Sequence, residues 1–241
     1  MKNTWLIKIA LLLVVVSLSS CDDYLNNCIR ANNRIVSETR RSLPFFNSLS
    51  LEGSYELELT YGNDFYVELE GPSNIINHIQ TIVDDKTLTF YSNECFNSVD
   101  KVKIYVTMPL IEAIWLNGSG SITSTNTLLA DNLSIYADGS GKIDVALDAL
   151  ELRLSVMGSG LVDLYGIVDD EFININGSGK IRSFGLEALA TEVQIIGSGN
   201  VEVRTLDELD VSIRGSGSVF YKGNPNVKTT LSGSGGVFDA N

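Results

Sequence analysis

The chain has 241 residues, a formal net charge of −13 and one histidine. So large an excess of acid argues against binding to nucleic acids and to anionic lipid headgroups, because both are negatively charged. The length is enough for one sizeable domain or two small ones.

Residues 1–21 resemble the signal peptide of a bacterial lipoprotein. Two lysines precede an apolar run at 9–16, and Leu18-Ser19-Ser20-Cys21 closes the segment. In signals of this kind the cysteine becomes the lipidated N-terminus. A transmembrane anchor is the alternative, but the run is shorter than the roughly 20 residues that cross a bilayer. We therefore expect a lipid anchor at Cys21 in the cell envelope, with the outer membrane as the expected location.

Residues 22–41 are polar, show little periodicity and are expected to form a tether. Cys28 lies in this segment, and Cys95 is the other cysteine that follows the signal. An exported protein with two cysteines permits one disulfide, although two unpaired cysteines remain an alternative.

Residues 43–116 are expected to form an irregular β segment. Four stretches alternate apolar and polar residues with period two, as half-buried strands do; they are 55–61, 65–70, 88–91 and 102–106. Gly62-Asn63-Asp64 predicts a hairpin turn, and Pro72 opens a short helical turn over 72–79. We expect this segment to supply the first coils, or a cap, of the structure that follows.

From residue 117 to 241 the triplet Gly-Ser-Gly recurs seven times, at intervals of 18 to 21 residues. A fixed period near twenty indicates a repeat architecture. The residues two before and four after each first glycine are apolar in every copy, and no triplet continues into the Gly-Lys-Ser/Thr of a nucleotide-binding loop. The glycine pairs are Gly118 and Gly120, Gly139 and Gly141, Gly158 and Gly160, Gly177 and Gly179, Gly197 and Gly199, Gly215 and Gly217, and Gly233 and Gly235.

Apolar alternation on both sides of each triplet predicts two strands that meet at a corner. A further apolar position recurs midway between triplets and suggests a third side for each coil; it is occupied by Leu128, Leu150, Ile167, Leu186 and Leu206. The predicted fold is all-β, a right-handed parallel β-helix with repeats of about 19 residues. An antiparallel meander is the alternative, but it would not need identical residue types to recur in register.

In this alternation both glycines of a triplet fall on the inward phase and the serine falls on the outward phase. A residue without Cβ lets the chain bend and lets neighbouring coils approach closely. The serines are then free to stack into a hydrogen-bonded ladder along the solenoid. A serine-lined recognition strip is the functional alternative.

The repeated unit apolar-x-Gly-Ser-Gly-x-β-branched resembles the head GIN domain family of auto-transporter adhesins, which is common in Bacteroidetes envelope proteins. The upstream run VKIYVTMPLIEAIWLNGSGSI is similar to that family as well. The resemblance extends from about Leu43 to the C-terminus. It implies a mainly parallel β-helix that is frequently lipid-anchored, and it supplies no catalytic residues.

The sequence shows little chemistry of its own. His78 is the single histidine, no Cys/His cluster has metal-ligand spacing, and no aspartate recurs at a fixed offset as calcium-binding repeats require. We therefore expect no catalytic, cofactor or metal site. Asp144, Asp163 and Glu202 occupy equivalent repeat positions and would align on one outward, solvated face.

The function expected from these patterns is that of an envelope-anchored, non-catalytic solenoid that binds a glycan or protein ligand at a surface. A polysaccharide-active β-helix enzyme and a purely structural envelope protein are the alternatives.

Overall fold

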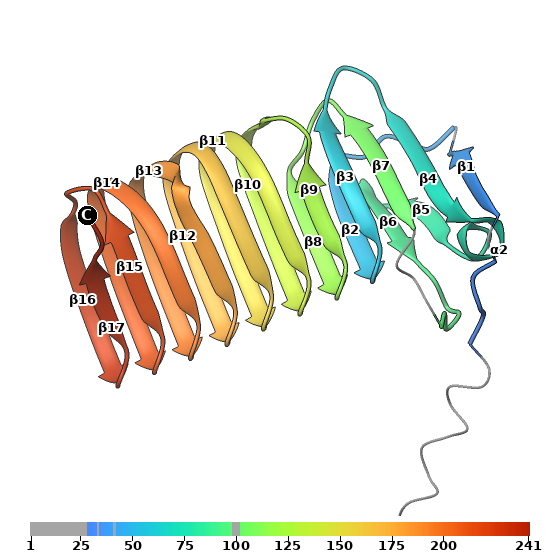
Figure 1. Cartoon of the computed structure of the whole chain (residues 1–241). Coiled ribbons are helices and arrows are strands. Elements are labelled where there is room, and N and C mark those ends of the chain that lie inside the picture. The colour runs from blue at the N-terminus through green and yellow to red at the C-terminus, as the bar shows by residue number, and fades with distance from the viewer. Residues whose placement is uncertain (1–27, 33, 41, 98–101) are drawn as a thin grey trace, which may run out of the picture.

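The computed structural model describes residues 28–32, 34–40, 42–97 and 102–241. Figure 1 shows a solenoid whose coils stack along one axis, with shorter strands and one helical turn at its N-terminal end. Within these ranges no helix is both long and apolar enough to cross a membrane. The predicted lipidation site, Cys21, lies outside the described residues.

The repeated part of the chain is a stack of coils joined at the Gly-Ser-Gly corners. β11 to β14 each run from one corner to the next and so form a whole coil (Figure 1). The strands of this part are β8 (Ala113–Gly118), β9 (Ser121–Ser124), β10 (Leu128–Gly139), β11 (Lys142–Gly158), β12 (Leu161–Gly177), β13 (Lys180–Gly197), β14 (Asn200–Gly215), β15 (Ser218–Lys222), β16 (Asn226–Gly233) and β17 (Gly236–Asp239).

Neighbouring coils pair in parallel and in the register of the repeat. Gly139 lies opposite Gly158, which in turn lies opposite Gly177. Four residues beyond the corners, Ile143 and Val162 are opposite each other in the same way. The predicted parallel solenoid is therefore confirmed, and the antiparallel meander is excluded for these coils.

Each coil is a flattened loop with two arms, as Figure 1 shows. In β11 the buried positions run up to Ala149 and resume at Leu152, so the alternation changes phase where the chain bends for the second time. The predicted third apolar side holds for Leu128 and Leu186, which are buried, and is wrong for Leu150 and Ile167, which are exposed. At the bend of β11, Leu150 and Glu151 are two consecutive residues that do not face the core. Ile167 lies opposite Asp148, just before this bend.

The first coil precedes the repeats in sequence but joins their stack. β2 (Ser48–Gly53) pairs in parallel with β8, and β3 (Glu56–Tyr61) pairs in parallel with β9. Gly53 lies opposite Gly118, so that Gly53-Ser54-Tyr55 is an eighth corner with tyrosine in place of the second glycine. The 43–116 segment thus begins the same solenoid, as expected.

Beyond the first coil the chain builds a cap. β6 (Thr87–Tyr91) and β7 (Lys103–Met108) continue the two arms in parallel. β4 (Tyr66–Pro72) and β5 (Gln80–Asp84) then add to β7 and β6 in the antiparallel direction, with α2 (Ser73–Ile76) between them. β3 and β4 are not a hairpin, as the Gly62 turn suggested, because β7 lies between them.

The described part of the predicted 22–41 tether is bound to this cap rather than free. β1 (Ile35–Thr39) pairs antiparallel with β4. Cys28 forms a disulfide with Cys95, and the backbone next to it bridges Ile29 to Phe96. The expectation of a tether is therefore wrong for these residues. Without β1, the edge of β4 would present a row of unpaired backbone groups, and a strand can satisfy them through its backbone even when few of its side chains are apolar.

Candidate functional site: corners, ladders and grooves of the outer face

The first glycine of every triplet is required by its backbone conformation. All seven have φ between +101° and +132°, a region that side chains rarely adopt. A Cβ atom at Gly177 would also lie 2.6 Å from the carbonyl oxygen of Gly158 in the preceding coil. These first glycines are partly or fully exposed, so the prediction that both glycines face inward is wrong for the first. The positive φ of the first glycine interrupts the alternation of inward and outward residues at this position.

The second glycine faces the core, as predicted. Gly179 is buried, and a Cβ atom there would lie 2.5 Å from Cγ1 of Val156 in the preceding coil. Because Gly179 has a hydrogen atom in place of a side chain, the side chain of Val156 can fill this space. The two glycines of a corner therefore have different roles, one in the turn and one in packing.

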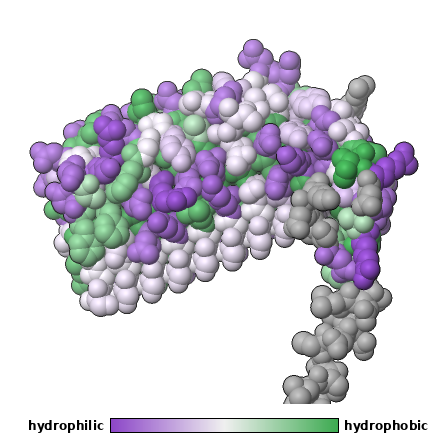
Figure 2. All heavy atoms as spheres, viewed as in Figure 1, coloured by the Kyte–Doolittle hydropathy of each residue, from purple (hydrophilic) through white to green (hydrophobic). Residues whose placement is uncertain are grey.

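The corner serines are held mainly through their backbone. The N–H of Ser178 donates to the carbonyl of Gly158 at 2.8 Å, and the equivalent bond recurs in the other repeats. One hydroxyl pair is recorded in the described ranges, Ser234 Oγ donating to Ser216 Oγ at 3.0 Å, so the predicted serine ladder is mostly a backbone ladder. In Figure 2 the corners form a continuous pale edge of intermediate hydropathy, below a surface on which hydrophilic and hydrophobic residues are mixed. The edge carries no charged side chain, which favours a structural role.

The carboxylates that suggested an enzyme do align in one ladder. Asp144, Asp163, Arg182 and Glu202 lie opposite one another in successive coils. Asp163 is buried, not solvated as expected. Arg182 donates to both of its oxygens at 2.5 and 2.6 Å, and Lys142 Nζ lies 3.3 Å from it.

Cations neutralise this whole ladder. Burial alone would raise the pKa of Asp163, but the hydrogen bonds from Arg182 and Lys142 outweigh it and keep that pKa below its usual value. Lys142 also donates to Asp144 at 2.8 Å, and Lys180 lies 3.4 Å from Glu202. A general acid needs a raised pKa. The ladder therefore functions as a set of ion pairs within and between coils.

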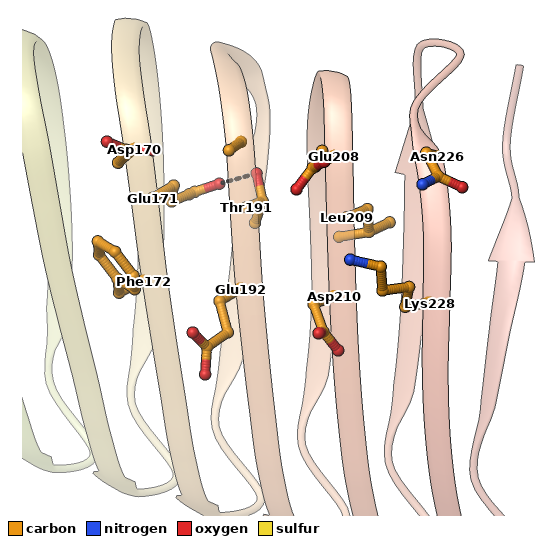
Figure 3. Close-up of a pocket in the computed structure, with 11 residues that line it drawn as sticks. Asp170, Glu171, Phe172, Thr191, Glu192, Glu208, Leu209, Asp210, Asn226 and Lys228 are labelled. Carbon is orange, nitrogen blue, oxygen red and sulfur yellow. Dashed lines mark hydrogen bonds between the residues drawn. The ribbon is translucent and has the colours of Figure 1, made fainter.

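A second group of acids borders a shallow cavity of about 230 Å³ over β12, β13, β14 and β16. Figure 3 shows Asp170, Glu192, Glu208 and Asp210 around it, with Lys228 at one side. In the described ranges no three His, Cys, Asp or Glu residues are placed to hold a metal ion together. The acids of this cavity have no feature that selects a ligand.

Glu171, in the same region, belongs to the interior. It lies in the ladder between Leu152 and Thr191 and is fully buried. Thr191 Oγ1 donates to Glu171 Oε2 at 3.3 Å (Figure 3), and Oε1 has no partner in the described structure. Burial raises the pKa of Glu171 to about 7, although the hydroxyls of Thr191 and Ser183 lower it somewhat.

A third depression has the features of a binding site. It has a volume of about 550 Å³ and lies across β2, β8 and β10; we call it the aromatic groove. Its floor is a row of small residues, Ser48, Ala113 and Ser134, which lie opposite one another. Two residues further along the strands stand Trp115 and Tyr136. Leu110, Glu112, Asp131 and Asn132 also line the groove and precede the small residues along the chain, whereas the two rings follow them; we call these four residues the opposite wall.

Trp115 and Tyr136 stack almost in parallel. Their ring centroids are 5.4 Å apart and the angle between the ring planes is 6°. The next ladder position on either side is a serine, Ser50 or Ser155. No second bulky residue of the ladder therefore stacks on the outer faces of the pair.

The polar side chains of the opposite wall are free to bind a ligand. Within the described part of the chain, the side chains of Glu112, Asp131 and Asn132 have neither a hydrogen-bond nor an ion-pair partner, and all three are exposed. The same is true of the Ser134 hydroxyl on the floor. An aromatic wall opposite several unpaired polar groups is typical of small-ligand sites, which have volumes of about 300–1,000 Å³.

The sequence prediction missed this groove. The stacked pair could have been found from the repeat alignment, since Trp115 and Tyr136 both stand three residues before a first glycine. Asp131 and Asn132 lie within the repeats, but Leu110 and Glu112 lie outside them, so the repeat alignment does not bring the two halves of the opposite wall together.

Several solved structures share this fold. The crystal structure described as "a putative adhesin" from Bacteroides fragilis NCTC 9343 matches with a TM-score of 0.84 and 27% identity, over 88% of this chain and 99% of that chain. A "putative adhesin" from Parabacteroides merdae ATCC 43184 matches with a TM-score of 0.75 and 19% identity, over 89% of this chain and 100% of that chain.

A "putative lipid binding protein" from Parabacteroides distasonis ATCC 8503 has the same fold, with a TM-score of 0.71 and 23% identity, over 88% of this chain and 99% of that chain. No curated protein shows a significant match. The family model described as "Putative auto-transporter adhesin, head GIN domain" matches residues 45–225, which include the first coil, the cap and most of the corners. The chain therefore belongs to the head GIN domain family.

Proposed function

We propose that this protein is an adhesin of the cell envelope, anchored by a lipid on Cys21, and that it binds a surface or extracellular ligand without catalysing a reaction. Family membership supports the adhesin role, as does the 27% identical Bacteroides structure described in the same terms. The Cys28–Cys95 disulfide supports an oxidising location outside the cytoplasm.

The observation that carries the proposal is the aromatic groove. Its stacked rings, and with them Asp131 and Asn132, lie on β8 and β10, each of which pairs with a strand on both sides, and Glu112 directly precedes β8. A rigid site loses little conformational entropy on binding. We therefore propose the groove as the ligand-binding site of the adhesin.

Two observations favour binding over the enzyme alternative. The aligned acids Asp144, Asp163 and Glu202 are paired with lysine and arginine. The lowered pKa of Asp163 is the opposite of what proton donation to a leaving group requires. The purely structural alternative leaves the groove without a role.

The proposal is tested by cell fractionation and by adhesion. Cells of a Gram-negative host that express the full chain should carry it in the membrane fraction and adhere to immobilised matrix proteins or glycans. Cys21→Ser should move the protein to the soluble fraction and abolish adhesion, while Cys28→Ser should leave it in the membrane. Unchanged membrane partitioning of Cys21→Ser would refute the anchor, and equal adhesion of cells with and without the protein would refute the adhesin.

A further inference from the structure

We propose that the aromatic groove binds a neutral saccharide of two or more pyranose rings, which rests on the proposed function because it names the ligand class of the adhesin. The inference follows from the shape of the ring pair, the chemistry of the opposite wall and the way the groove continues around the coil.

The stacked pair provides a flat apolar surface. The C–H bonds on one face of a pyranose carry a small positive charge, and they pack against the negative face of an aromatic ring. Trp115 and Tyr136 are within 6° of parallel, and Tyr136 is 37% exposed. Because the next ladder residue after Tyr136 is the small Ser155, no bulky ladder neighbour covers the outer face of this tyrosine, and we propose that a sugar ring stacks there.

The opposite wall provides hydrogen-bond groups for hydroxyls. Glu112 and Asp131 are acceptors, whereas Asn132 both donates and accepts, and none of the three has a partner in the described structure. Hydroxyl groups of a neutral sugar would donate to the two carboxylates. A uronate or a sulfated sugar would place a negative charge beside them, and the chain as a whole is acidic. The charges of the groove therefore favour a neutral saccharide over an acidic one.

A cationic ligand is the other partner that aromatic rings and carboxylates can bind. Sites for quaternary ammonium groups surround the cation with ring faces at steep angles to one another. Here the two rings cover each other and form a single platform. The geometry suits a flat, ring-shaped ligand better than a spherical cation.

The groove is longer than one sugar ring. A second depression, of about 380 Å³, lies around the bend of the coil and shares Leu110 and Asp131 with the first. Its lining includes the exposed Leu129 and Leu150. These two exposed leucines offer apolar surface to a second sugar ring. Asp131 lies between the two positions.

Tryptophan fluorescence tests the inference at the site itself. The chain has two tryptophans, Trp5 and Trp115. Trp5 lies in the proposed signal peptide, so Trp5→Phe ensures that the emission comes from the groove alone even in unprocessed protein. It would be titrated, in a detergent without sugar headgroups, with tetrasaccharides of glucose, mannose, galactose and N-acetylglucosamine. At least one of the four should change the emission of Trp115 to saturation, while tetragalacturonate and tetramethylammonium should not.

Two variants locate the binding. Tyr136→Ala and Asp131→Ala should each weaken the affinity at least about tenfold, as loss of a central contact does. Phe220→Ala is the matched control, since this exposed ring stacks on Phe238 far from the groove, with centroids 5.3 Å apart. It should bind as the parent does, and thermal unfolding would show that all three variants remain folded.

Three results would overturn the inference: no response to any neutral tetrasaccharide, unchanged affinity of Tyr136→Ala, or saturation by tetramethylammonium instead. The last result would make the groove a cation site. Failure here is distinct from failure of the proposed function. Cys21-dependent adhesion without saccharide binding refutes only the saccharide, whereas saccharide binding without adhesion refutes only the adhesin.

Discussion

At the scale of single residues, Glu171 is the least expected feature of the interior. It lies between Leu152 and Thr191 in its ladder, with Ser183 and Thr205 also buried in the interior, and one carboxyl oxygen has no partner in the described structure. A buried group of this kind is stable only when protonated. Its stability contribution should therefore depend on pH.

We predict that the protein is more stable in mild acid than at neutral pH because of Glu171. Its pKa rises from 4.5 when exposed to about 7 in the fold. The contribution is complete below pH 4.5 and is lost as the pH rises through 7, which costs about 3 kcal/mol in all. Glu171→Gln should remove this loss, so that urea denaturation shows it more stable than the parent at pH 8 and similar at pH 4.

Asp170→Asn is the control for that experiment, because Asp170 is adjacent but exposed. It should preserve the pH dependence of the parent. A parent protein equally stable at pH 4.5 and pH 8 would show that Glu171 is hydrated in solution.

The corners make a second residue-scale prediction. Gly177→Val should reduce the free energy of unfolding by at least about 2 kcal/mol, because valine is strained at φ +130° and its Cβ would lie 2.6 Å from the oxygen of Gly158. Ser178→Ala, whose side chain points outward, should change it by less than about 0.5 kcal/mol. Equal and small losses in chemical denaturation would contradict a packed corner.

At the scale of elements, the repeats could be predicted from the sequence because each inward position is occupied by the same residue type in successive coils. The first corner could not be recognised with the same search. Gly53-Ser54-Tyr55 lacks the second glycine, although Leu51 and Leu57 stand at the expected apolar offsets. The structure pairs Gly53 with Gly118 across a long stretch of intervening chain, and a periodic pattern carries no information about such an insertion.

β1 shows a different limit of sequence analysis. Three of its five residues are polar and four are exposed, including Ile35, so hydrophobic periodicity gives no signal. What forms the strand is the unpaired edge of β4, a property of the neighbouring element. The candidate site shows the same limit. The ladder of Trp115 and Tyr136 follows the repeat period and can be found from the sequence. The position of Glu112 depends instead on the path of the loop from β7 in the cap to β8 in the coils.

The disulfide joins the start of the described chain to the cap, and we predict that it stabilises the protein. It closes a separation of 67 residues, for which the chain-entropy model gives about 4 kcal/mol. Thermal unfolding of the Cys28→Ser/Cys95→Ser double variant should therefore occur at a lower temperature than that of the parent. Addition of a reductant should reproduce the loss in the parent and have no effect on the double variant. Equal melting of the oxidised parent and the double variant would show that the cap holds this segment without the bond.

At the scale of the whole molecule, the two ends of the solenoid differ. The N-terminal end is covered by the antiparallel strands β4 and β5 and by α2. At the other end β16 and β17 each pair with one coil of the described structure, and residues of β16 on the inward phase, such as Leu231, are exposed. In a solenoid each coil is stabilised by its neighbours, so a coil with one neighbour is the weakest.

We therefore predict a gradient of hydrogen exchange along the axis. Amides of β16 and β17 should exchange first, because opening them breaks one interface and exposes little new apolar surface. Amides of β12 and β13 should exchange last, since opening them separates two fully paired coils. β6 and β7 are the internal comparison: the cap pairs with both, so they should exchange more slowly than β16 and β17. Strong protection of β16 and β17 at low protein concentration would contradict the gradient. If that protection appeared only at high concentration, a second copy of the chain would be covering this end.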